Sequence, residues 1–311
     1  MFDNPSTHFV HAGTQDFRSV TNANRDNFVN EIHDQDGIFH AKFGPYKLRS
    51  AFQPIYAVVP DALSLYAYEA LVRPEASGKP VYPSDLFDTT AGYDLGELDR
   101  LCRSIHIRNY QLVRNENATL FLNIDPSHFT NIKSVETEFQ YLFSELQSND
   151  IAASKVVCEI IEAKATSDNL IARMRDMLRE FGAKIAVDDY GSDHSNWQRF
   201  ELVQPDILKL DGPVFRNLCK TPAAVPALQK LTTSLHEIGC ILLVEGVETR
   251  NQFDITIEAG VSLIQGYFLA KPAPTKRQFP RIPTAAFLPG QNKIHHSQAF
   301  QPTIFLQELS D

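Results

Sequence analysis

The chain has 311 residues and a net charge of −9, and 43% of its residues are apolar while 22% are charged. These values fit one large α/β domain of barrel size with extensions, or two ordinary domains, and they are unlike those of an all-helical or disordered protein. The acidic balance and the absence of a lysine and arginine stripe exclude broad binding to a nucleic-acid polymer. No uncharged apolar run approaches the roughly 18 residues of a membrane span, so we expect a soluble protein.

The four cysteines are widely spaced and form no CxxC pattern, which indicates neither a zinc knuckle nor a disulfide framework. Three of them stand in apolar stretches, where a buried free thiol is expected. The first residues lack the basic region and apolar run of a signal peptide. We therefore expect a cytoplasmic protein.

Residues 1–46 are polar, show neither helical nor strand periodicity, and are expected to form an N-terminal extension. Residues 47–275 alternate short apolar strands with amphipathic helices. The expected strands span residues 48–59, 64–73, 118–126, 155–163, 183–189, 207–211, 240–248 and 261–269. The expected helices span residues 83–113, 135–146, 167–181, 223–238 and 252–259. The Pro-rich residues 276–311 form a C-terminal tail that we expect to pack on the outside or to stay mobile.

This alternation predicts parallel strands joined by helical crossovers. Seven of the strands carry polar residues in or at the end of the apolar run: Glu69, Asn123, Glu159, Asp188 with Asp189, Lys209, Glu245 and Gln265. In a (β/α)₈ barrel the ends of successive strands converge on one rim, so these side chains would surround one mouth. A flat doubly wound sheet would spread them along an edge, which makes the barrel the favoured fold.

Two adjacent carboxylates, Asp188 and Asp189, end an apolar strand just before Gly191. Neighbouring residues of a strand point to opposite faces, so both can act on one site only where the strand ends and the backbone turns. Their charges repel unless a cation shares them, and a divalent metal ion is the natural counter-ion. Taken alone, the pair fits a solvated turn or a helix-capping acid better than a metal site.

Taken together, the motifs resemble those of the EAL-domain family of cyclic di-GMP phosphodiesterases, over about residues 48–273. The tripeptide Glu69-Ala70-Leu71 is followed by Arg73, and the other motifs occur in the family's order. They are FQPI with Gln53, LNI with Asn123, CEIIE with Glu159 and Glu162, VDDYG with Asp188 and Asp189, LKLD with Lys209, VEGVE with Glu245 and Glu248, and QGY with Gln265.

The resemblance implies a modified TIM barrel whose first strand is antiparallel, and hydrolysis of cyclic di-GMP, a bacterial second messenger, to linear pGpG. It implies two Mg²⁺ or Mn²⁺ ions, which suit oxygen ligands. The ligands of the first ion would be Glu69, Asn123, Glu159 and Asp188, and those of the second Asp188, Asp189 and Glu245. Such a pair of ions activates water and braces the attacking and leaving oxygens.

The resemblance also implies roles for other side chains. Catalytic roles fall to Lys209, Glu245, Gln265 and Glu162, where Lys209 orients water or offsets transition-state charge and Glu162 steadies the loop after the two aspartates. Substrate contacts fall to Gln53 and Arg73. The alternative for Lys209 is a structural ion pair with the acids, and the alternative for Arg73 is a surface salt bridge. For Glu248 we expect a structural role near the rim.

One segment departs from the family. Where the family usually continues DFGTGYSSL, this chain reads DYGSDHSNW, so that Asp193 replaces a glycine. In the family this loop links the metal site to the dimer interface, and a homodimer is therefore expected. The leading hypothesis is an active phosphodiesterase. The alternatives are a weak or inactive cyclic di-GMP receptor or protein-interaction module, and an unrelated TIM-barrel metal hydrolase.

Overall fold

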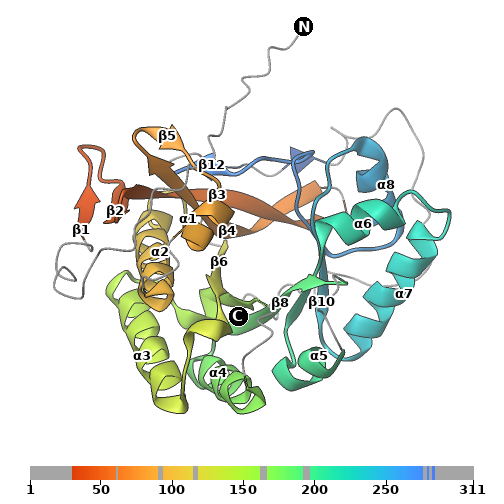
Figure 1. Cartoon of the computed structure of the whole chain (residues 1–311). Helices are drawn as coiled ribbons and strands as arrows, with labels where there is room; N and C mark the ends of the chain where they lie inside the picture. The colour runs from red at the N-terminus through yellow and green to blue at the C-terminus, as the bar shows by residue number, and fades with distance from the viewer. Residues whose placement is uncertain are drawn as a thin grey trace, which may run out of the picture.

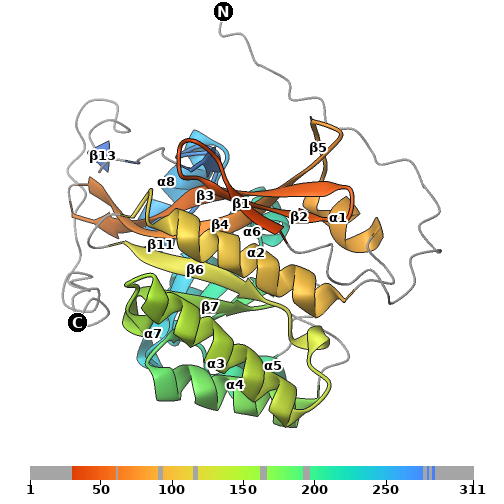
Figure 2. The same ribbon diagram turned by 90° about the vertical axis from the view of Figure 1, so that its left-hand side faces the viewer.

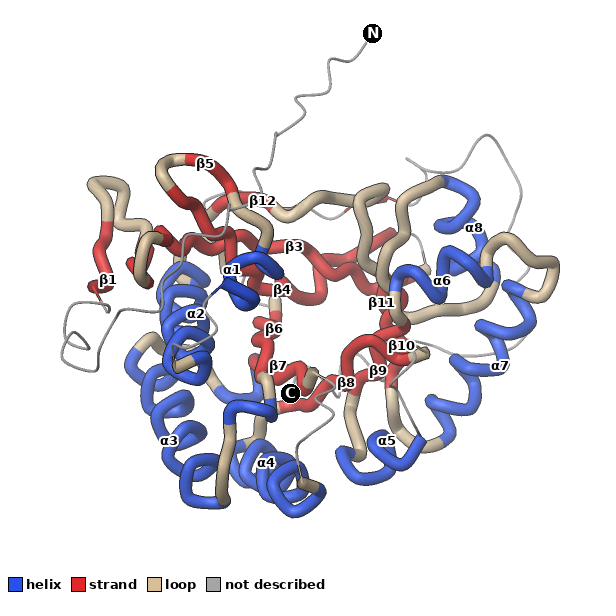
Figure 3. The backbone as a smooth tube through the Cα atoms, viewed as in Figure 1, coloured by secondary structure: helices blue, strands red, loops and turns tan. Residues whose placement is uncertain are grey.

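The computed structural model describes residues 30–60, 62–89, 94–114, 118–161, 167–191, 197–275, 279 and 282–283. Within these ranges eight strands form a closed barrel (Figures 1 and 3). In order around the barrel they are β3 (Tyr46–Val59), β4 (Ala62–Ala76), β6 (Thr119–Ile124), β7 (Val156–Ile160), β8 (Lys184–Tyr190), β9 (Ile207–Leu210), β10 (Ile241–Val244) and β11 (Leu263–Ile264). The strand β3 is antiparallel to both neighbours, β4 and β11, while the other neighbours run parallel. The expected barrel with an antiparallel first strand is therefore confirmed.

The helices lie outside the barrel (Figure 3). Inside it, a buried cluster combines aliphatic side chains with the rings of Tyr66 and Phe121. The helices are α1 (Pro83–Thr89), α2 (Leu95–Tyr110), α3 (Ile132–Ser148), α4 (Asp168–Phe181), α5 (Trp197–Val203), α6 (Gly212–Leu218), α7 (Ala224–Glu237) and α8 (Arg250–Glu258), with 3₁₀ turns at Pro126–His128 and Ala153–Lys155. Residues facing outward from the strands, such as Leu122 and Leu242, join the larger core beneath the helices. None of the helices in the described part of the chain has the length and apolarity needed to cross a bilayer.

The helix expected over residues 83–113 is two helices. The second, α2, begins after Asp94, whose side chain accepts a hydrogen bond from the backbone N–H of Glu97. An aspartate in extended backbone at this position caps a new helix rather than continuing an old one. The apolar spacing predicts the buried face of α2, but it does not reveal the Asp94 cap that divides the stretch.

The N-terminal extension contributes strands that the periodicity did not reveal. β1 (Asn30–His33) and β2 (Phe39–Phe43) form an antiparallel hairpin, and β2 pairs with the part of β3 that reaches beyond the barrel. Asn109 of α2 fastens this hairpin, because its side chain both accepts from the N–H and donates to the carbonyl of Phe39, at 2.8 and 2.7 Å. A third, small core lies between β2, the β3–β4 ribbon, α1 and α2.

Short strands outside the barrel order complete the sheet. β5 (Lys79–Pro80) pairs with β4, β12 (Ala273–Pro274) with β3, and β13 (Ile282–Pro283) with β4. Of the C-terminal tail, the described residues Phe279 and Ile282–Pro283 lie against β4. Phe279 is buried there with its ring 6.0 Å from that of Tyr68.

Candidate active site

Each barrel strand carries a polar side chain two residues from an apolar one that fills the barrel interior. The apolar positions include Phe121, Val157 and Ile207, which belong to one buried cluster inside the barrel. Because side chains two apart on a strand share a face, the polar residues also point inward, one layer nearer the mouth. We call these residues the polar ring: Gln53, Glu69, Asn123, Glu159, Asp188, Lys209, Glu245 and Gln265. Of the eight residues expected at strand ends, all except Asp189 belong to it, and Gln53 completes it.

The ammonium group of Lys209 lies at the centre of four carboxylates. Its Nζ is 2.7 Å from Oε1 of Glu159, 2.7 Å from Oε1 of Glu245, 3.0 Å from Oδ1 of Asp188 and 3.6 Å from Oε1 of Glu69. Glu159 is fully buried and Lys209 is 1% exposed. One positive charge therefore faces four carboxylates that come from four different strands.

Burial and mutual repulsion make full ionisation of these acids unfavourable. Burial raises the pKa of Glu159 well above its usual range, against the attraction of Lys209, and it raises the pKa of Glu245 to about 8. For Lys209, burial opposes the charged form, but the surrounding carboxylates outweigh burial and hold its pKa well above the ordinary value. The ring thus contains one permanently charged lysine and four carboxyl groups. Bound protons or further cations must neutralise the remaining negative charge.

The two glutamines of the ring hold neighbouring groups in place. Nε2 of Gln265 donates to Oε2 of Glu69 at 2.8 Å, which leaves Oε1 of Glu69 as the atom that faces Lys209. Nε2 of Gln53 donates to the carbonyl of Ala270 at 3.3 Å. Gln53 therefore ties the first strand to the segment that follows β11.

The two adjacent aspartates differ in their surroundings. Asp188 is half-buried and contacts Lys209, whereas Asp189 is exposed and has a φ of +56°. The pairing of β8 with β9 shifts register between Val187 and Tyr190, which marks a bulge at the two acids. Bulges re-aim side chains at functional sites, and this one breaks the simple alternation of the strand.

Glycines allow the strand ends beside the ring to touch. A Cβ on Gly266, directly after Gln265, would lie 2.1 Å from the carbonyl oxygen of Val247. A Cβ on Gly246, directly after Glu245, would lie 2.8 Å from the Cα of Gly212. A side chain at either position would prevent the two backbone segments from coming this close. The glycines therefore allow the close backbone contacts that position the ends of β10 and β11.

We expect Gly266→Ala to destabilise the protein by at least about 3 kcal/mol, because the added methyl group would meet backbone rather than a movable side chain. Chemical denaturation monitored by circular dichroism measures the loss. Gly260→Ala is the control: its φ of +72° is strained for alanine, but nothing lies within 4 Å of the new Cβ. Equal losses in the two variants would contradict the steric argument.

Arg73 and Glu248 were also expected near the site but do not belong to the polar ring. Arg73 is half-buried on β4, where burial lowers its pKa and the charge of Glu69 opposes that shift. Glu248 is exposed and accepts from Nη1 of Arg216 at 3.2 Å. Glu162 and residues 192–196 of the divergent loop lie outside the described residues.

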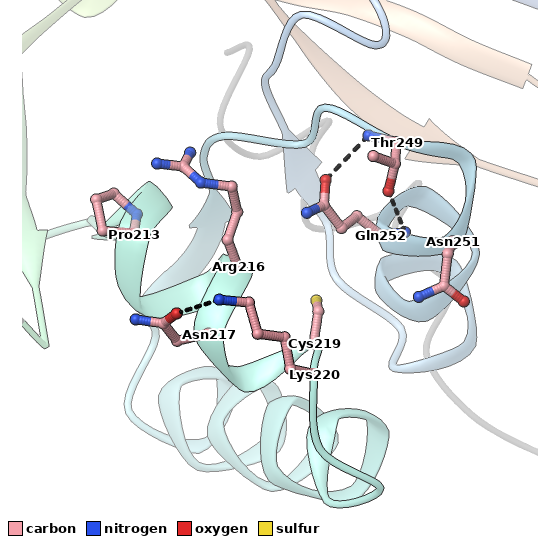
Figure 4. A pocket seen from close by; sticks show the side chains of 8 residues that line it. All are labelled: Pro213, Arg216, Asn217, Cys219, Lys220, Thr249, Asn251 and Gln252. Carbon is pink, nitrogen blue, oxygen red and sulfur yellow. Dashed lines mark hydrogen bonds between the residues drawn. The ribbon is translucent and has the colours of Figure 1, made fainter.

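Two surface cavities occur away from the ring. One, of about 390 Å³, lies between α6 and the start of α8 and is lined by Arg216, Lys220 and Thr249 among others (Figure 4). The other, of about 420 Å³, lies against α3 near Tyr141. Neither contains a residue of the polar ring.

The donor atoms of the ring suit a hard divalent cation. Both carboxylate oxygens of Glu159 and Oε1 of Glu245 are buried, and among the described residues the ammonium of Lys209, 2.7 Å from Oε1 of each glutamate, is the polar group that reaches them. Carboxylate and amide oxygens are the ligands that Mg²⁺ and Mn²⁺ prefer. Among the described residues, no three acidic, histidine or cysteine side chains are placed to hold an ion as they stand, and the ammonium of Lys209 lies among the acids. The fit to a divalent ion is therefore one of donor chemistry, carboxylate and amide oxygens, and not of a preformed cage.

Sequence reasoning missed one group near the ring. Arg103 of α2, buried with Asp99 and Glu138, donates to the backbone carbonyl of Asn123 at 3.4 Å. The available signal was a pair of opposite charges four residues apart, Asp99 and Arg103, within the apolar face of an amphipathic helix.

Comparison with known proteins agrees with this arrangement. The sequence profile of the EAL domain matches residues 42–272. The probable cyclic di-GMP phosphodiesterase PdeN of Escherichia coli (strain K12) is 25% identical over 234 residues, which cover 72% of this chain and 43% of PdeN. The chain thus spans less than half of the length of this relative.

Solved structures share the fold. The Bacillus subtilis YkuI protein with an EAL domain, in complex with substrate c-di-GMP and calcium, matches with a TM-score of 0.62 and 24% identity over 73% of this chain and 56% of YkuI. Klebsiella pneumoniae BlrP1 in a manganese and cy-diGMP complex at pH 9.0 matches with a TM-score of 0.66 and 20% identity over 82% of this chain and 60% of BlrP1. These likenesses establish the fold alone. The EAL profile covers most of the chain, and the protein therefore belongs to the EAL-domain family.

Proposed function

We propose that the protein is a metal-dependent phosphodiesterase that hydrolyses one phosphodiester bond of cyclic di-GMP and releases linear pGpG. The observation that carries this proposal is the convergence of four carboxylates on Lys209, with Glu159 fully buried. Desolvating so many acids is costly unless cations share their charge. The names of the relatives support the substrate, since PdeN is a probable cyclic di-GMP phosphodiesterase and YkuI and BlrP1 were solved with c-di-GMP and a divalent metal.

In this proposal two Mg²⁺ or Mn²⁺ ions bind on the ring. The first would be held by Glu69, Asn123, Glu159 and Asp188, and the second by Asp188, Asp189 and Glu245. When bound, the ions supply Lewis-acid chemistry that activates water and neutralises phosphoryl charge. Glu162 would steady the neighbouring loop.

The chain's own groups orient the reaction. Lys209 is a fixed cation, since neighbouring acids keep its pKa well above the ordinary value, and it stabilises negative charge that grows in the transition state. Gln265 holds Glu69 with one carboxylate oxygen turned toward the ring centre. Arg73 shares a face of β4 with Glu69 and would bind a substrate phosphate, and Gln53 would contact the substrate beside it.

The direct test is to incubate the purified protein with cyclic di-GMP and Mg²⁺ or Mn²⁺, and to separate the nucleotides by chromatography. We expect pGpG with either metal and none in the presence of EDTA. Binding of cyclic di-GMP without any product, at every metal concentration, would overturn the proposal and identify a receptor or interaction module instead. Neither binding nor product would point to a different hydrolase.

We expect the metal-free protein to become less stable as the pH rises from about 5 to 8. Burial raises the folded-state pKa of Glu245 to about 8 and that of Glu159 well above its usual range, so the folded state holds more protons than the unfolded state across this interval. The stability that these protons provide is complete below the unfolded pKa and is lost as the pH rises through the folded pKa. Thermal unfolding in EDTA measures the fall.

The control for this pH dependence is Glu245→Gln, which removes one of the titrating groups. Its unfolding temperature should depend less on pH than that of the wild type. Within this interval Mn²⁺ should raise the unfolding temperature of the wild type most at pH 8, where protons compete least with the metal. A wild-type stability that rises steadily from pH 5 to 8 in EDTA would contradict the assignment.

We further propose that the protein acts in the cytoplasm and forms a homodimer. All four cysteines are free thiols, and Cys102, Cys158 and Cys240 are buried, which suits a reducing compartment. The dimer follows from the family resemblance, and sedimentation velocity across a concentration series would test it.

A further inference from the structure

A buried arginine on the outside of the barrel contacts the backbone of a ring residue. Arg103 of α2 is 4% exposed, and its Nη1 donates to the carbonyl oxygen of Asn123 at 3.4 Å. The guanidinium also donates to Asp99, one turn earlier on α2, and through Nη2 to Oε1 of Glu138 on α3 at 2.5 Å. The other oxygen of Glu138 accepts from Nε of Arg100 at 2.8 Å. In Figure 2, helix α2 lies along β6, and α3 lies on the other side of β6 in that view. The charged cluster therefore connects α2, α3 and β6.

The Asn123 carbonyl points to a side of β6 where the described strands offer no partner. β4 pairs with β6 only as far as Glu69, whereas β7 pairs with it through Ile124. Successive carbonyls along a strand point to opposite sides, and the Ile124 carbonyl accepts from the N–H of Ile161 on the β7 side at 3.2 Å. The Asn123 carbonyl therefore faces the side that β4 has left. Arg103 donates to this carbonyl the hydrogen bond that a neighbouring strand would otherwise supply.

We infer that Arg103 is a positioning residue for Asn123. By holding the carbonyl of the same residue, the guanidinium fixes the backbone from which the side-chain amide projects into the polar ring. The inference rests on the proposed function, in which Asn123 is a ligand of the first metal ion. Groups that hold a ligand, without touching the metal, commonly change metal affinity by about 10-fold to 100-fold.

The chemistry of the cluster favours positioning over simple stability. Well-packed apolar side chains stabilise a buried interface as well as a buried ion cluster does, because desolvation offsets the attraction of the charges. The rigid fork of an arginine reaches three acceptors in different directions, here Asp99, Glu138 and Asn123. A lysine keeps the charge but lacks that fork. It should therefore preserve the ion pairs and lose the hold on Asn123.

The experiment measures Mn²⁺ binding by electron paramagnetic resonance of the free ion, in the full chain without nucleotide. We expect Arg103→Lys to weaken Mn²⁺ binding about 10-fold or more while the unfolding temperature changes by only a few degrees. The matched control is Arg100→Lys, which alters the same ion cluster through Glu138. It should leave Mn²⁺ binding unchanged. Equal effects in the two variants, or no effect of Arg103→Lys on a folded protein, would overturn the inference.

A double-variant comparison separates positioning from a general loosening of the site. If Arg103 acts through Asn123, Arg103→Lys should have no further effect on Mn²⁺ binding in an Asn123→Ala background. Full additivity of the two changes would show that Arg103 acts elsewhere. If Arg103→Lys fails to fold, the neutralised cluster Arg103→Met with Asp99→Asn and Glu138→Gln gives the same readout, with the same two outcomes.

The readout is independent of catalysis. Weaker Mn²⁺ binding in Arg103→Lys supports the positioning role even if the wild type releases no pGpG, which would overturn the proposed activity alone. Conversely, an active wild type whose Mn²⁺ affinity is insensitive to Arg103→Lys would retain the proposed activity and overturn the positioning role.

Discussion

Replacing Lys209 by methionine should lower kcat for cyclic di-GMP by about 10²-fold to 10³-fold with a smaller change in KM. The side chain is 1% exposed, and its ammonium group contacts four carboxylates at the centre of the ring. A preorganised cation at this place matters most when negative charge grows on the phosphoryl group, so the loss should fall on the chemical step. Steady-state kinetics under saturating Mn²⁺ provides the measurement.

The same variant should be unstable without metal. Methionine leaves four acids around an uncharged side chain, and loss of one partner from a buried ion pair typically costs about 3–5 kcal/mol. Saturating Mn²⁺ should restore much of this loss. Lys184→Met is the control, because Lys184 starts β8 at the opposite end of the barrel. An effect of Lys209→Met confined to KM would make Lys209 a binding residue, and no kinetic effect would leave it a structural ion pair.

Replacing Glu159 by glutamine should reduce kcat/KM by more than about 10³-fold, which corresponds to about 4 kcal/mol of transition-state stabilisation. The amide has the shape of the carboxylate but lacks its charge, so an ion that needs this ligand binds weakly. The metal-free protein should be as stable as the wild type at pH 8, or more stable, because a fully buried acid with a strongly raised pKa has been neutralised. Activity and thermal unfolding, measured on the same preparations, test both expectations.

The opposite signs of these two effects distinguish a ligand from a structural residue. A purely structural glutamate would lose stability and activity together. Glu180→Gln is the matched control, since Glu180 is exposed on α4 and pairs with Arg173. Near wild-type turnover of Glu159→Gln under saturating Mg²⁺ would falsify the metal assignment.

The order of strands and helices could be predicted because it depends on local patterns. Apolar runs that alternate with amphipathic helices read directly as parallel strands with crossovers, and each of the eight expected barrel strands occurs in the structure. The polar positions followed from the same patterns, because one inward residue near the end of each strand is polar where its neighbours are apolar. What the periodicity missed was short or depended on distant partners: the β1–β2 hairpin, and the break before α2 at the Asp94 cap.

The contacts within the ring could not be read from the chain in the same way. Gln265 and Glu69, whose side chains form a hydrogen bond, are 196 residues apart in sequence. The periodicity of the sequence does not predict the distance between these two side chains, because that distance depends on how the strands are staggered in the closed barrel. The touching backbones at Gly266 and Val247, and the reach of Arg103 to the Asn123 carbonyl, have the same origin.

By itself, the sequence determined that this protein has an α/β barrel with acidic and amide side chains at its strand ends. The reason is that strand periodicity, helix periodicity and the residue type at each strand end can all be recognised within short segments of the chain. The tertiary structure alone decided that Lys209 lies among four of those acids and that Asp189 is exposed at a bulge while Asp188 contacts Lys209. The physical reason is that charges interact through space, with a strength set by distance and burial. Both quantities exist only once distant strands have closed into the barrel.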